Sequence, residues 1–569
     1  MCMFNDILEI CRKNPEILLF LSLGAGYYLG KFKFKGFSLG ATASVLLVAL
    51  VLGQIPGVQV PGLLKTVSFS LFTFCIGYSV GPQFFGALKK QGLSYIWVAL
   101  VVAVAALVTA LALGKLFGFS PGTTAGLLAG ALTTSAAIGT AEGAITHLPG
   151  ISAAAKTAME TDVAIAYGIT YIFGTVGGIL MFTLLPGLMG INLKEESKKL
   201  EESYSGGGDD ADKSPDLFSW SKQLSLRAYR GENEKIFGKT VGFIEGLFPQ
   251  RTVVEAVQRD KDSLTIQPEL AIQSGDILII GSPSRKSMLA APGLIGPEQD
   301  IAGLTDIVGE VMEVCVLNKE ISGKTIAELG NRKEAHGLFL RKITRQGNTV
   351  PILPKTVIER CDILQLIGRK EDVERAVQMI GFAERPTDVT DMVVVGGGVV
   401  LGTLIGLLVV NIAGIPISLG VGGGVLVSGL IFGWLRTLHP TYGQIPSASR
   451  WILQNLGLNL FIACVGLGAG SQALAALKTT GLSVFIAGVL LTIIPVLAGL
   501  LFAKLFMKLN PVFLLGSLTG SRNLTAALLT LEEQAESSMP VLGYAAPYAV
   551  ANVVLTIWGS LLVNILHRL

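Results

Sequence analysis

The chain has 569 residues, of which 51% are hydrophobic and only 15% are charged, against about 25% charged residues in a soluble domain. This composition excludes a soluble protein throughout. The formal net charge of +3, with basic residues at the ends of apolar runs, gives no reason to expect a nucleic-acid partner. The four histidines are well separated and form no triad or metal cluster, so we expect neither an enzyme nor a bound metal.

The first block, residues 1–191, contains apolar runs of the length that a membrane-spanning helix needs. Lysines follow the first run where a cleavable signal would have small residues, so we interpret this run as a spanning helix. A further segment, 121–146, is rich in Gly, Ala, Ser and Thr, and we expect it to be a re-entrant or broken helix. The candidate spans are 15–30, 37–54, 62–85, 93–117 and 158–186.

The central block is polar and carries most of the charges. Residues 192–217 are low in complexity and predict a flexible linker. Two α+β modules follow, at 218–300 and 301–385. Each has alternating strand patterns, a short helix after Gly-Lys-Thr (238–240 and 323–325) and a closing Asp-Ile-Leu strand (276–278 and 362–364). Because neither a P-loop nor a dinucleotide fingerprint is present, no cofactor is predicted.

The second membrane block, residues 386–569, repeats the first. Leu71–Ser94 and Leu460–Ser483 share twelve of twenty-four residues without a gap. The motif Gly126–Ala137 aligns with Gly516–Ala527. Further along, the alignment pairs the Tyr-rich helices through Tyr167 and Tyr548. The predicted spans here are 393–412, 417–434, 452–471, 482–507 and 545–567, with a small-residue segment at 511–531.

Lysine and arginine in short loops predict the orientation. With both termini outside and the central block in the cytoplasm, most basic loops face the cytoplasm, Lys115 being an exception. Each block then crosses the membrane five times, and the two have opposite topology. We therefore expect an all-α membrane protein of two inverted repeats with a cytoplasmic α+β insert, an arrangement typical of secondary transporters.

These duplicated blocks, with their GxxxGxQ and GSLTGSRNLTAA motifs and paired central modules, resemble the aspartate:alanine exchanger family along essentially the whole chain. The modules resemble the C-terminal regulatory domains of potassium-transport regulators. The resemblance implies a multi-pass protein of the bacterial inner membrane that exchanges aspartate for alanine or moves C4-dicarboxylates such as succinate. It also implies a homodimer and a small regulatory ligand at the modules.

The tips of the two small-residue segments are the candidate substrate site, because irregular backbone and free helix N-termini inside the membrane suit an anion. The candidate residues are Thr133, Thr134, Ser135, Ser521, Arg522 and Asn523. The guanidinium of Arg522 can bind a carboxylate through two hydrogen bonds. The alternatives are that Arg522 anchors its hairpin at the cytoplasmic surface, and that the Ser, Thr and Asn side chains pack helices.

Four further acidic residues lie near these segments. Glu160 and Asp162 are predicted to lie at the start of the last helix of the first block. There they either favour the helix N-terminus or couple transport to protons or cations. Glu142 and Glu532 occupy matching positions after the tips and are expected at a solvated rim.

The leading hypothesis is an exchanger of small carboxylates that moves one bundle against a fixed scaffold, in the manner of an elevator. A cation-coupled anion or dicarboxylate symporter is the alternative. A channel or sensor gated by the modules belongs to a different class, and the absence of a selectivity-filter sequence argues against it.

Overall fold

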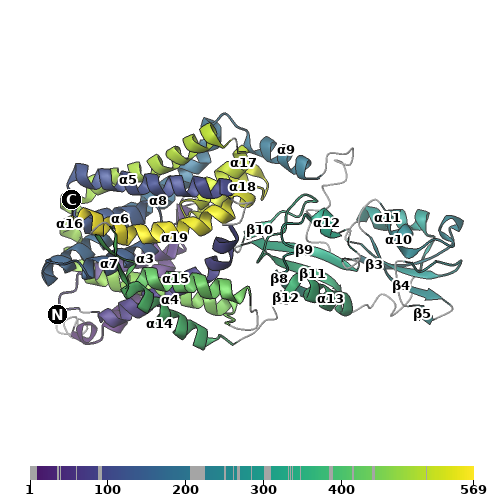
Figure 1. Ribbon diagram of the computed structural model, residues 1–569, viewed down its shortest axis with the longest axis horizontal. Helices are drawn as coiled ribbons and strands as arrows, with labels where there is room; N and C mark the ends of the chain where they lie inside the picture. Colours follow the sequence, from purple (N-terminus) through teal and green to yellow (C-terminus); the bar gives the residue numbers. More distant parts are fainter. Residues whose placement is uncertain are drawn as a thin grey trace. The chain divides into compact units, whose positions relative to one another are not determined.

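The computed structural model describes the chain from residue 9 to residue 568. It leaves out residues 35–36, 39, 59, 88–92, 206–224, 249–251, 260–261, 265–268, 283–284, 300–308, 331, 333–334, 336, 346–347, 384–388, 413–414, 439–442 and 508. The chain divides into two units (Figure 1). One is a helical membrane unit of residues 1–198 and 386–569, and the other is a central unit of residues 199–385.

The first half of the membrane unit is a series of apolar helices separated by short turns. Several begin with local capping: Ser120 accepts a hydrogen bond from the Thr123 amide and is followed by Pro121, and Ser152 caps the last helix through the Ala155 amide. The helices are α2 (Pro15–Gly30), α3 (Gly40–Leu52), α4 (Gly62–Ala87), α5 (Leu93–Phe117), α6 (Pro121–Ala131), α7 (Ala136–Thr146) and α8 (Ala153–Leu188), with a two-stranded hairpin of β1 (Lys33–Phe34) and β2 (Phe37–Ser38).

The second half repeats this order. Asp391 caps its first helix by accepting from the amides of Val393 and Val394, and Asn510 caps α17 ahead of Pro511. The elements are α14 (Met392–Leu407), β13 (Val409–Ile412), β14 (Ile415–Ser418), α15 (Gly420–Arg436), α16 (Ser447–Phe506), α17 (Pro511–Gly520), α18 (Thr525–Ala535) and α19 (Val541–Leu566).

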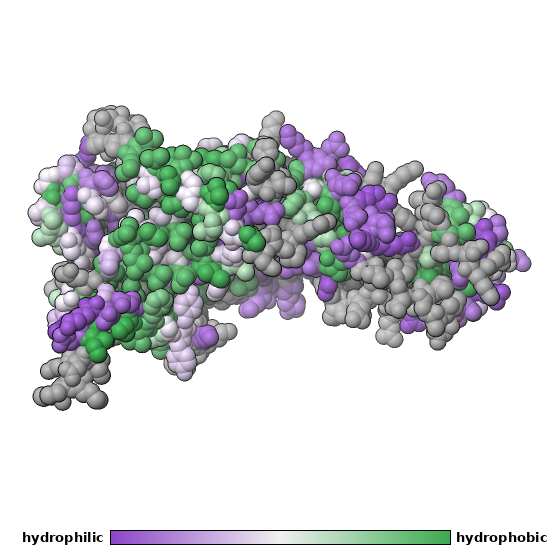
Figure 2. Space-filling view, turned by 90° about the horizontal axis from the view of Figure 1, so that it is seen from below, coloured by the Kyte–Doolittle hydropathy of each residue, from purple (hydrophilic) through white to green (hydrophobic). Residues whose placement is uncertain are grey.

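Six helical segments in the described part of the chain are long and apolar enough to cross a membrane: 62–82, 94–117, 153–188, 447–471, 481–506 and 541–566. Large apolar side chains such as Leu63, Leu188 and Leu482 are strongly exposed on the membrane unit. On the face shown in Figure 2, this unit is largely hydrophobic, and the described part of the central unit is mainly hydrophilic. The mostly helical membrane fold predicted from the sequence is thus confirmed at this level.

The two spans predicted at 452–471 and 482–507 correspond to the apolar segments 447–471 and 481–506. Both belong to α16, a single helix of 60 residues, which the sequence analysis did not predict. The intervening sequence, QALAALKTT, consists mostly of residues that favour a helix and lacks Gly and Pro. The helix cannot run straight. Gly466 and Gly168 both pack against Leu46, and Gly488 packs against Thr170. A straight helix would separate Gly466 from Gly488 by about 33 Å, so these two segments of α16 lie near one another.

Two pairs of glycines make matching contacts between the two halves. In α4, Gly77 and Gly81 lie against the backbone of Leu426 and Leu430 in α15. In α16, Gly466 and Gly470 lie in the same way against α3, around Leu46 and Gly53. Both of these glycine pairs, which have GxxxG spacing, therefore pack on a helix of the other half, as expected for close helix approach in a membrane.

Replacing Gly77 by Leu should separate α4 from α15. A Cβ atom at this position would lie 2.3 Å from the carbonyl oxygen of Leu426, and forcing extra atoms into a packed contact costs about 1–3 kcal/mol or more. We expect a lower melting temperature of the purified protein. Gly24→Leu is the control, because Gly24 is exposed with no neighbouring atom within 4 Å. Equal melting temperatures of the two variants would contradict this interpretation.

The central unit contains two five-stranded sheets with matching strand orders, β5-β4-β6-β3-β7 and β10-β9-β11-β8-β12. Neighbouring strands pair antiparallel. The strands are β3 (Ser225–Arg230), β4 (Val253–Arg259), β5 (Asp262–Leu264), β6 (Ile277–Ser282), β7 (Glu298–Gln299), β8 (Gly309–Val316), β9 (Leu338–Arg345), β10 (Asn348–Val350), β11 (Ile363–Arg369) and β12 (Gly381–Ala383).

Helices accompany both sheets. They are α10 (Val241–Glu245) and α11 (Arg285–Leu294) in the first module, and α12 (Ile326–Gly330) and α13 (Lys370–Ile380) in the second. Helix α9 (Leu193–Ser205) lies within the stretch that the sequence assigns to a flexible linker, so that assignment is wrong for these residues. Charged residues at α9 positions 194–202 are also compatible with a solvated helix.

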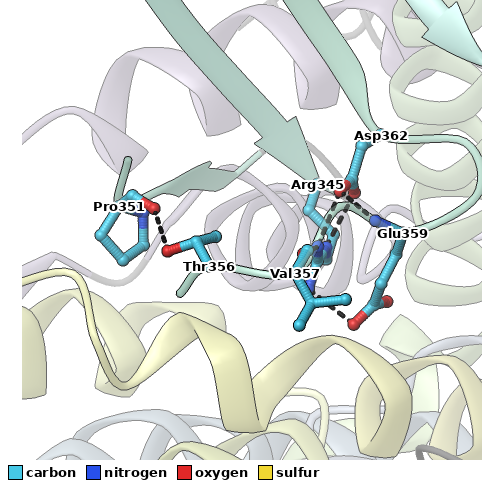
Figure 3. A network of polar contacts seen from close by, with 6 residues as sticks. All are labelled: Arg345, Pro351, Thr356, Val357, Glu359 and Asp362. Atoms are coloured by element: carbon cyan, nitrogen blue, oxygen red, sulfur yellow. Dashed lines mark hydrogen bonds and ion pairs between the residues drawn. The ribbon is translucent and has the colours of Figure 1, made fainter. Parts of the chain in front are cut away.

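The two modules share one ion-pair motif at the end of a strand. In the first, Arg259 Nε and Nη2 donate to the two carboxylate oxygens of Asp276, each at 2.8 Å. In the second, Arg345 makes the same two bonds to Asp362 at 2.7 Å, and its Nη1 donates to Glu359. Figure 3 shows the carboxylates of Asp362 and Glu359 directed toward this guanidinium.

The two ion pairs differ in burial. The Arg345 side chain is only 4% exposed, whereas that of Arg259 is 26% exposed. Burial lowers the pKa of Arg345, but the carboxylates of Asp362 and Glu359 raise it further, so its pKa lies above the usual value. The charged guanidinium is therefore a fixed part of the second module.

Candidate functional site

Both small-residue segments are broken helices, with the break at the predicted tips. Helix α6 ends at Ala131 and α7 begins at Ala136, while α17 ends at Gly520 and α18 begins at Thr525. Within the two breaks, Thr133 (φ 53°) and Asn523 (φ 57°) occupy aligned positions in the left-handed region. This region is uncommon for residues other than glycine. Its occurrence at matched positions of both tips indicates backbone strain of the kind found at functional sites.

The two tips contact each other, although they are almost 400 residues apart in the chain. Thr133 Oγ1 donates to the carbonyl oxygen of Arg522 at 3.3 Å, and Asn523 Nδ2 donates to Thr134 Oγ1 at 3.3 Å. The predicted candidates from both halves thus meet at one place inside the membrane unit.

Arg522 is the most unusual residue at this place. Its side chain is fully buried. Nη2 donates to the carbonyl oxygens of Ala131 at 2.8 Å and Gly174 at 2.9 Å, and Nη1 donates to that of Thr492 at 3.3 Å. Nε has no partner, and no acidic side chain of the described chain lies within the 4.0 Å of an ion pair. Backbone dipoles alone therefore compensate this cation.

Full burial decides against the interpretation of Arg522 as an anchor at an aqueous surface. The carbonyl partners were not foreseen from the sequence, because they come from α6, α8 and α16. The lack of a side chain on Gly178 leaves space for the guanidinium, since a Cβ atom there would lie 3.2 Å from Arg522 Cζ.

The remaining candidate side chains serve different local roles. Ser135 Oγ lies 2.7 Å from the Tyr167 hydroxyl, a hydrogen bond whose donor can be either group. Ser521 Oγ donates to the Ser517 carbonyl of its own helix at 2.6 Å, which favours the packing interpretation for this residue. The amide oxygen of Asn523 is buried without a partner. Asn523 and Arg522 thus supply the unfilled polar atoms of the site.

The tyrosines correct the sequence alignment of the last helices. Thr525, which aligns with Ser135, contacts the hydroxyl of Tyr544 at 2.8 Å. Gly130 packs on the Tyr167 carbonyl and Gly520 on the Tyr544 carbonyl. The structural counterpart of Tyr167 is therefore Tyr544 and not Tyr548. The shift is four residues, which is one helical turn and preserves the same apolar face.

The acidic candidates do not lie at the tips. Helix α8 begins at Ala153, so Glu160 and Asp162 are beyond its first turn, and the N-terminal interpretation of these two residues is wrong. Asp162 accepts a hydrogen bond from Ser120 Oγ at 2.6 Å. Glu160 lies 3.2 Å from Lys65 Nζ. Residues of the metal-binding type form no cluster of three in the described part of the chain.

Glu142 was expected at a solvated rim, and this expectation is wrong. It is 5% exposed and lies 3.0 Å from Lys65 Nζ. The sequence analysis did not single out Lys65. The available signal was a lysine near the start of an otherwise apolar run, but its acidic partners are 77 and 95 positions away in the chain, which no local pattern reveals.

A family model agrees with this architecture. The model for Asp-Al_Ex, described as a predicted permease membrane region, matches residues 18–187 and again residues 394–564. The chain belongs to this permease family. A TrkA-C domain model also matches residues 311–381, the second central module. The resemblance of the membrane blocks is thereby confirmed, and that of the central modules is confirmed for the second module.

Relatives in this permease family are similar over nearly their whole length. An uncharacterized transporter of Shewanella oneidensis is 38% identical over 97% of this chain and 98% of its own. An uncharacterized transporter of Bradyrhizobium diazoefficiens is 38% identical with the same coverage. No solved structure matches the chain. The family and the apolar helices support transport across a membrane as the function and a membrane as the location.

Proposed function

We propose that this permease is a secondary active transporter that exchanges small carboxylates, such as aspartate and alanine or C4-dicarboxylates. The observation that carries the proposal is Arg522, a fully buried guanidinium without an acidic partner in the described chain and with an unfilled Nε donor. A buried charge requires compensation, and a substrate carboxylate would supply it by accepting a charge-assisted hydrogen bond from the unfilled Nε. The hydroxyls of Thr133 and Thr134 would contact the other end of the substrate.

The repeated contacts support an inverted-repeat mechanism. Helix α4 packs on α15 through a pair of glycines, and α16 packs on α3 through another pair. Each half therefore contributes one glycine-bearing helix that packs on a helix of the other half. Such an arrangement suits alternating access in which one bundle moves against a fixed scaffold, an elevator-type motion with the substrate at the broken helices.

Counterflow in proteoliposomes tests the transport proposal. Vesicles loaded with aspartate, alanine, succinate or glutamate should take up the labelled carboxylate faster than empty vesicles do. Protein-free vesicles are the control. Absence of counterflow with every carboxylate, together with robust flux of another class of solute, would reject the proposal.

A cation-coupled symporter is the second candidate function. The charged side chains of Lys65, Glu142 and Glu160 within the membrane unit favour it, since intramembrane ionisable residues commonly serve coupling. Net uptake driven by a sodium gradient, with no need for internal substrate, would distinguish this alternative from exchange.

The proposed orientation places both termini outside and the central unit in the cytoplasm of a bacterial inner-membrane protein. In a cysteine-free background, a cysteine at position 205 should be protected from impermeant thiol reagents in intact cells, and one at position 568 should be labelled. The reason is the distribution of Lys and Arg in the loops. Labelling after permeabilisation controls for reactivity, and the opposite pattern would invert the topology.

The central unit is proposed to regulate transport as a homodimer that binds a small ligand. Both sheets end in edge strands, β5 and β7 or β10 and β12, whose outer backbone groups a second copy can cover. A ligand would bias transport if it discriminates between two conformations. A monomeric mass in detergent-corrected light scattering would count against the dimer. Unchanged flux and ligand response after replacing residues 205–385 by a short linker would count against regulation.

A further inference from the structure

A second group of charges lies inside the membrane unit, away from Arg522. It consists of Lys65, Glu142 and Glu160. Lys65 Nζ lies 3.0 Å from Glu142 Oε2 and 3.2 Å from Glu160 Oε2. The three side chains come from α4, α7 and α8, so the ammonium group joins three helices. Thr146 Oγ1 also donates to Glu160 Oε1 at 3.4 Å.

The charges of this site do not balance when all three groups are ionised. Two carboxylates and one ammonium leave one negative charge. This excess negative charge is less favourable on Glu142 than on Glu160, because Glu142 is 5% exposed whereas the Glu160 side chain is 30% exposed. Neither oxygen of Glu142 receives a well-oriented hydrogen bond from the described residues, even though Lys65 is close to Oε2. Burying an incompletely compensated carboxylate is unfavourable, and one added proton would remove the imbalance.

Other polar groups around the site leave this imbalance in place. Lys156 Nζ donates to the Thr146 carbonyl, and His147 Nδ1 lies against the Gly143 carbonyl. Asp162 is engaged by Ser120. Helix α16 contributes the thiol of Cys464 to the surrounding core, and the facing helices α15 and α19 place apolar and small residues near α7.

The position of Glu142 connects this site to the tips. Helix α7 starts at Ala136, just after the break, so Glu142 stands about 9 Å along the same helix at 1.5 Å per residue. A movement of α7 that follows substrate binding at the tip would necessarily change the surroundings of Glu142. Binding at one place can then alter binding at the other.

We propose that Glu142 is the proton-binding carboxyl of this transporter, and that Lys65 and Glu160 position it. The ionised carboxylate takes up one proton to become a neutral acid, and Lys65 then remains paired with Glu160. A proton fits better than a metal cation, because the ammonium of Lys65 already occupies the space between the two carboxylates. The loaded carrier moves with Glu142 protonated, and release of the proton allows the unloaded carrier to return. This inference rests on the proposed transport of carboxylates and specifies its second candidate form, cation-coupled symport, with the proton as the coupling ion.

The test separates exchange from net transport. Proteoliposomes containing wild type, Glu142→Gln or the control Glu532→Gln are assayed for counterflow without an ion gradient and for net succinate or aspartate uptake under a pH gradient. Glu532 occupies the matching position in the second half, is partly exposed and has no ion pair among the described residues. A pH indicator in weak buffer reports substrate-dependent proton movement.

We expect wild type and Glu532→Gln to accumulate aspartate by up to about tenfold per pH unit, since one proton with this monoanion makes an electroneutral cycle. Glu142→Gln, a permanently neutral analogue of the protonated acid, should keep counterflow within about threefold of wild type and lose accumulation and proton movement. Retained accumulation in Glu142→Gln overturns the assignment. So does a wild type with strong counterflow but no proton movement, or one driven by sodium alone.

A failed wild-type counterflow assay would count against the proposed function instead. If Glu142→Gln does not fold, Glu142→Asp is used, which keeps a carboxyl group on a shorter side chain. Net uptake by that variant should retain proton coupling with a shifted pH midpoint. A midpoint identical to wild type would overturn the role of Glu142.

Discussion

Arg522→Ala is expected to lower the affinity for the substrate carboxylate by several hundred-fold or more. Breaking a buried ion pair by removing one partner costs about 3–5 kcal/mol, and each 1.4 kcal/mol corresponds to a factor of ten in affinity. Arg522→Lys should also be impaired, since an ammonium keeps the charge and loses the planar pair of donors. Titration of the purified variants with substrate, followed calorimetrically, measures the change.

Arg522→Ala also removes the hydrogen-bond donor of three carbonyl oxygens, those of Ala131, Gly174 and Thr492. Thermal stability must therefore be measured on the same preparation. Leu132→Ala is the matched control, because Leu132 is a fully buried residue at the aligned position of the other tip and bears no charge. An Arg522→Ala protein with reduced stability and unchanged affinity would show that this residue only holds the broken helices together.

Arg345→Ala should destabilise the second central module by about 3–5 kcal/mol, since it leaves the buried carboxylate of Asp362 without its cation. Arg259→Ala removes the equivalent, more exposed arginine of the first module and should have a smaller effect. Hydrogen exchange of the amides in β9 and β11 of the full-length protein measures the local opening. Equal losses of protection in the two modules would contradict the role of burial.

The duplication and the broken helices could be predicted from sequence because they leave local marks. Apolar runs, small residues at the tips and the pair of Gly-Lys-Thr motifs are each readable within a few residues. Other features depend on distant partners. The carbonyl groups that surround Arg522 belong to three helices. The contact of Lys65 with Glu142 and Glu160 joins residues that no spacing rule connects.

Some errors arose where two arrangements satisfy the same local pattern. Tyr548 fits an alignment with Tyr167 as well as Tyr544 does, because a shift of four residues keeps the helix face. The start of α8 was placed too late, since Ala153–Thr157 is less apolar than the run that follows, although the Ser152 cap marks it. Burial of Glu142 was missed because a carboxylate after a small-residue segment is ordinarily solvated.

The glycine contacts between α4 and α15 have a thermodynamic consequence. At Gly77, Gly81, Gly429 and Gly433 the opposing surface is mainly backbone. Side chains with several rotamers lose conformational entropy when they are ordered, and glycine has none to lose. At these positions the two helices therefore meet without that entropic penalty, and hard-sphere repulsion between the backbones limits how closely they approach. Such a pair deforms little, which suits it to the fixed scaffold of the proposed elevator-type motion.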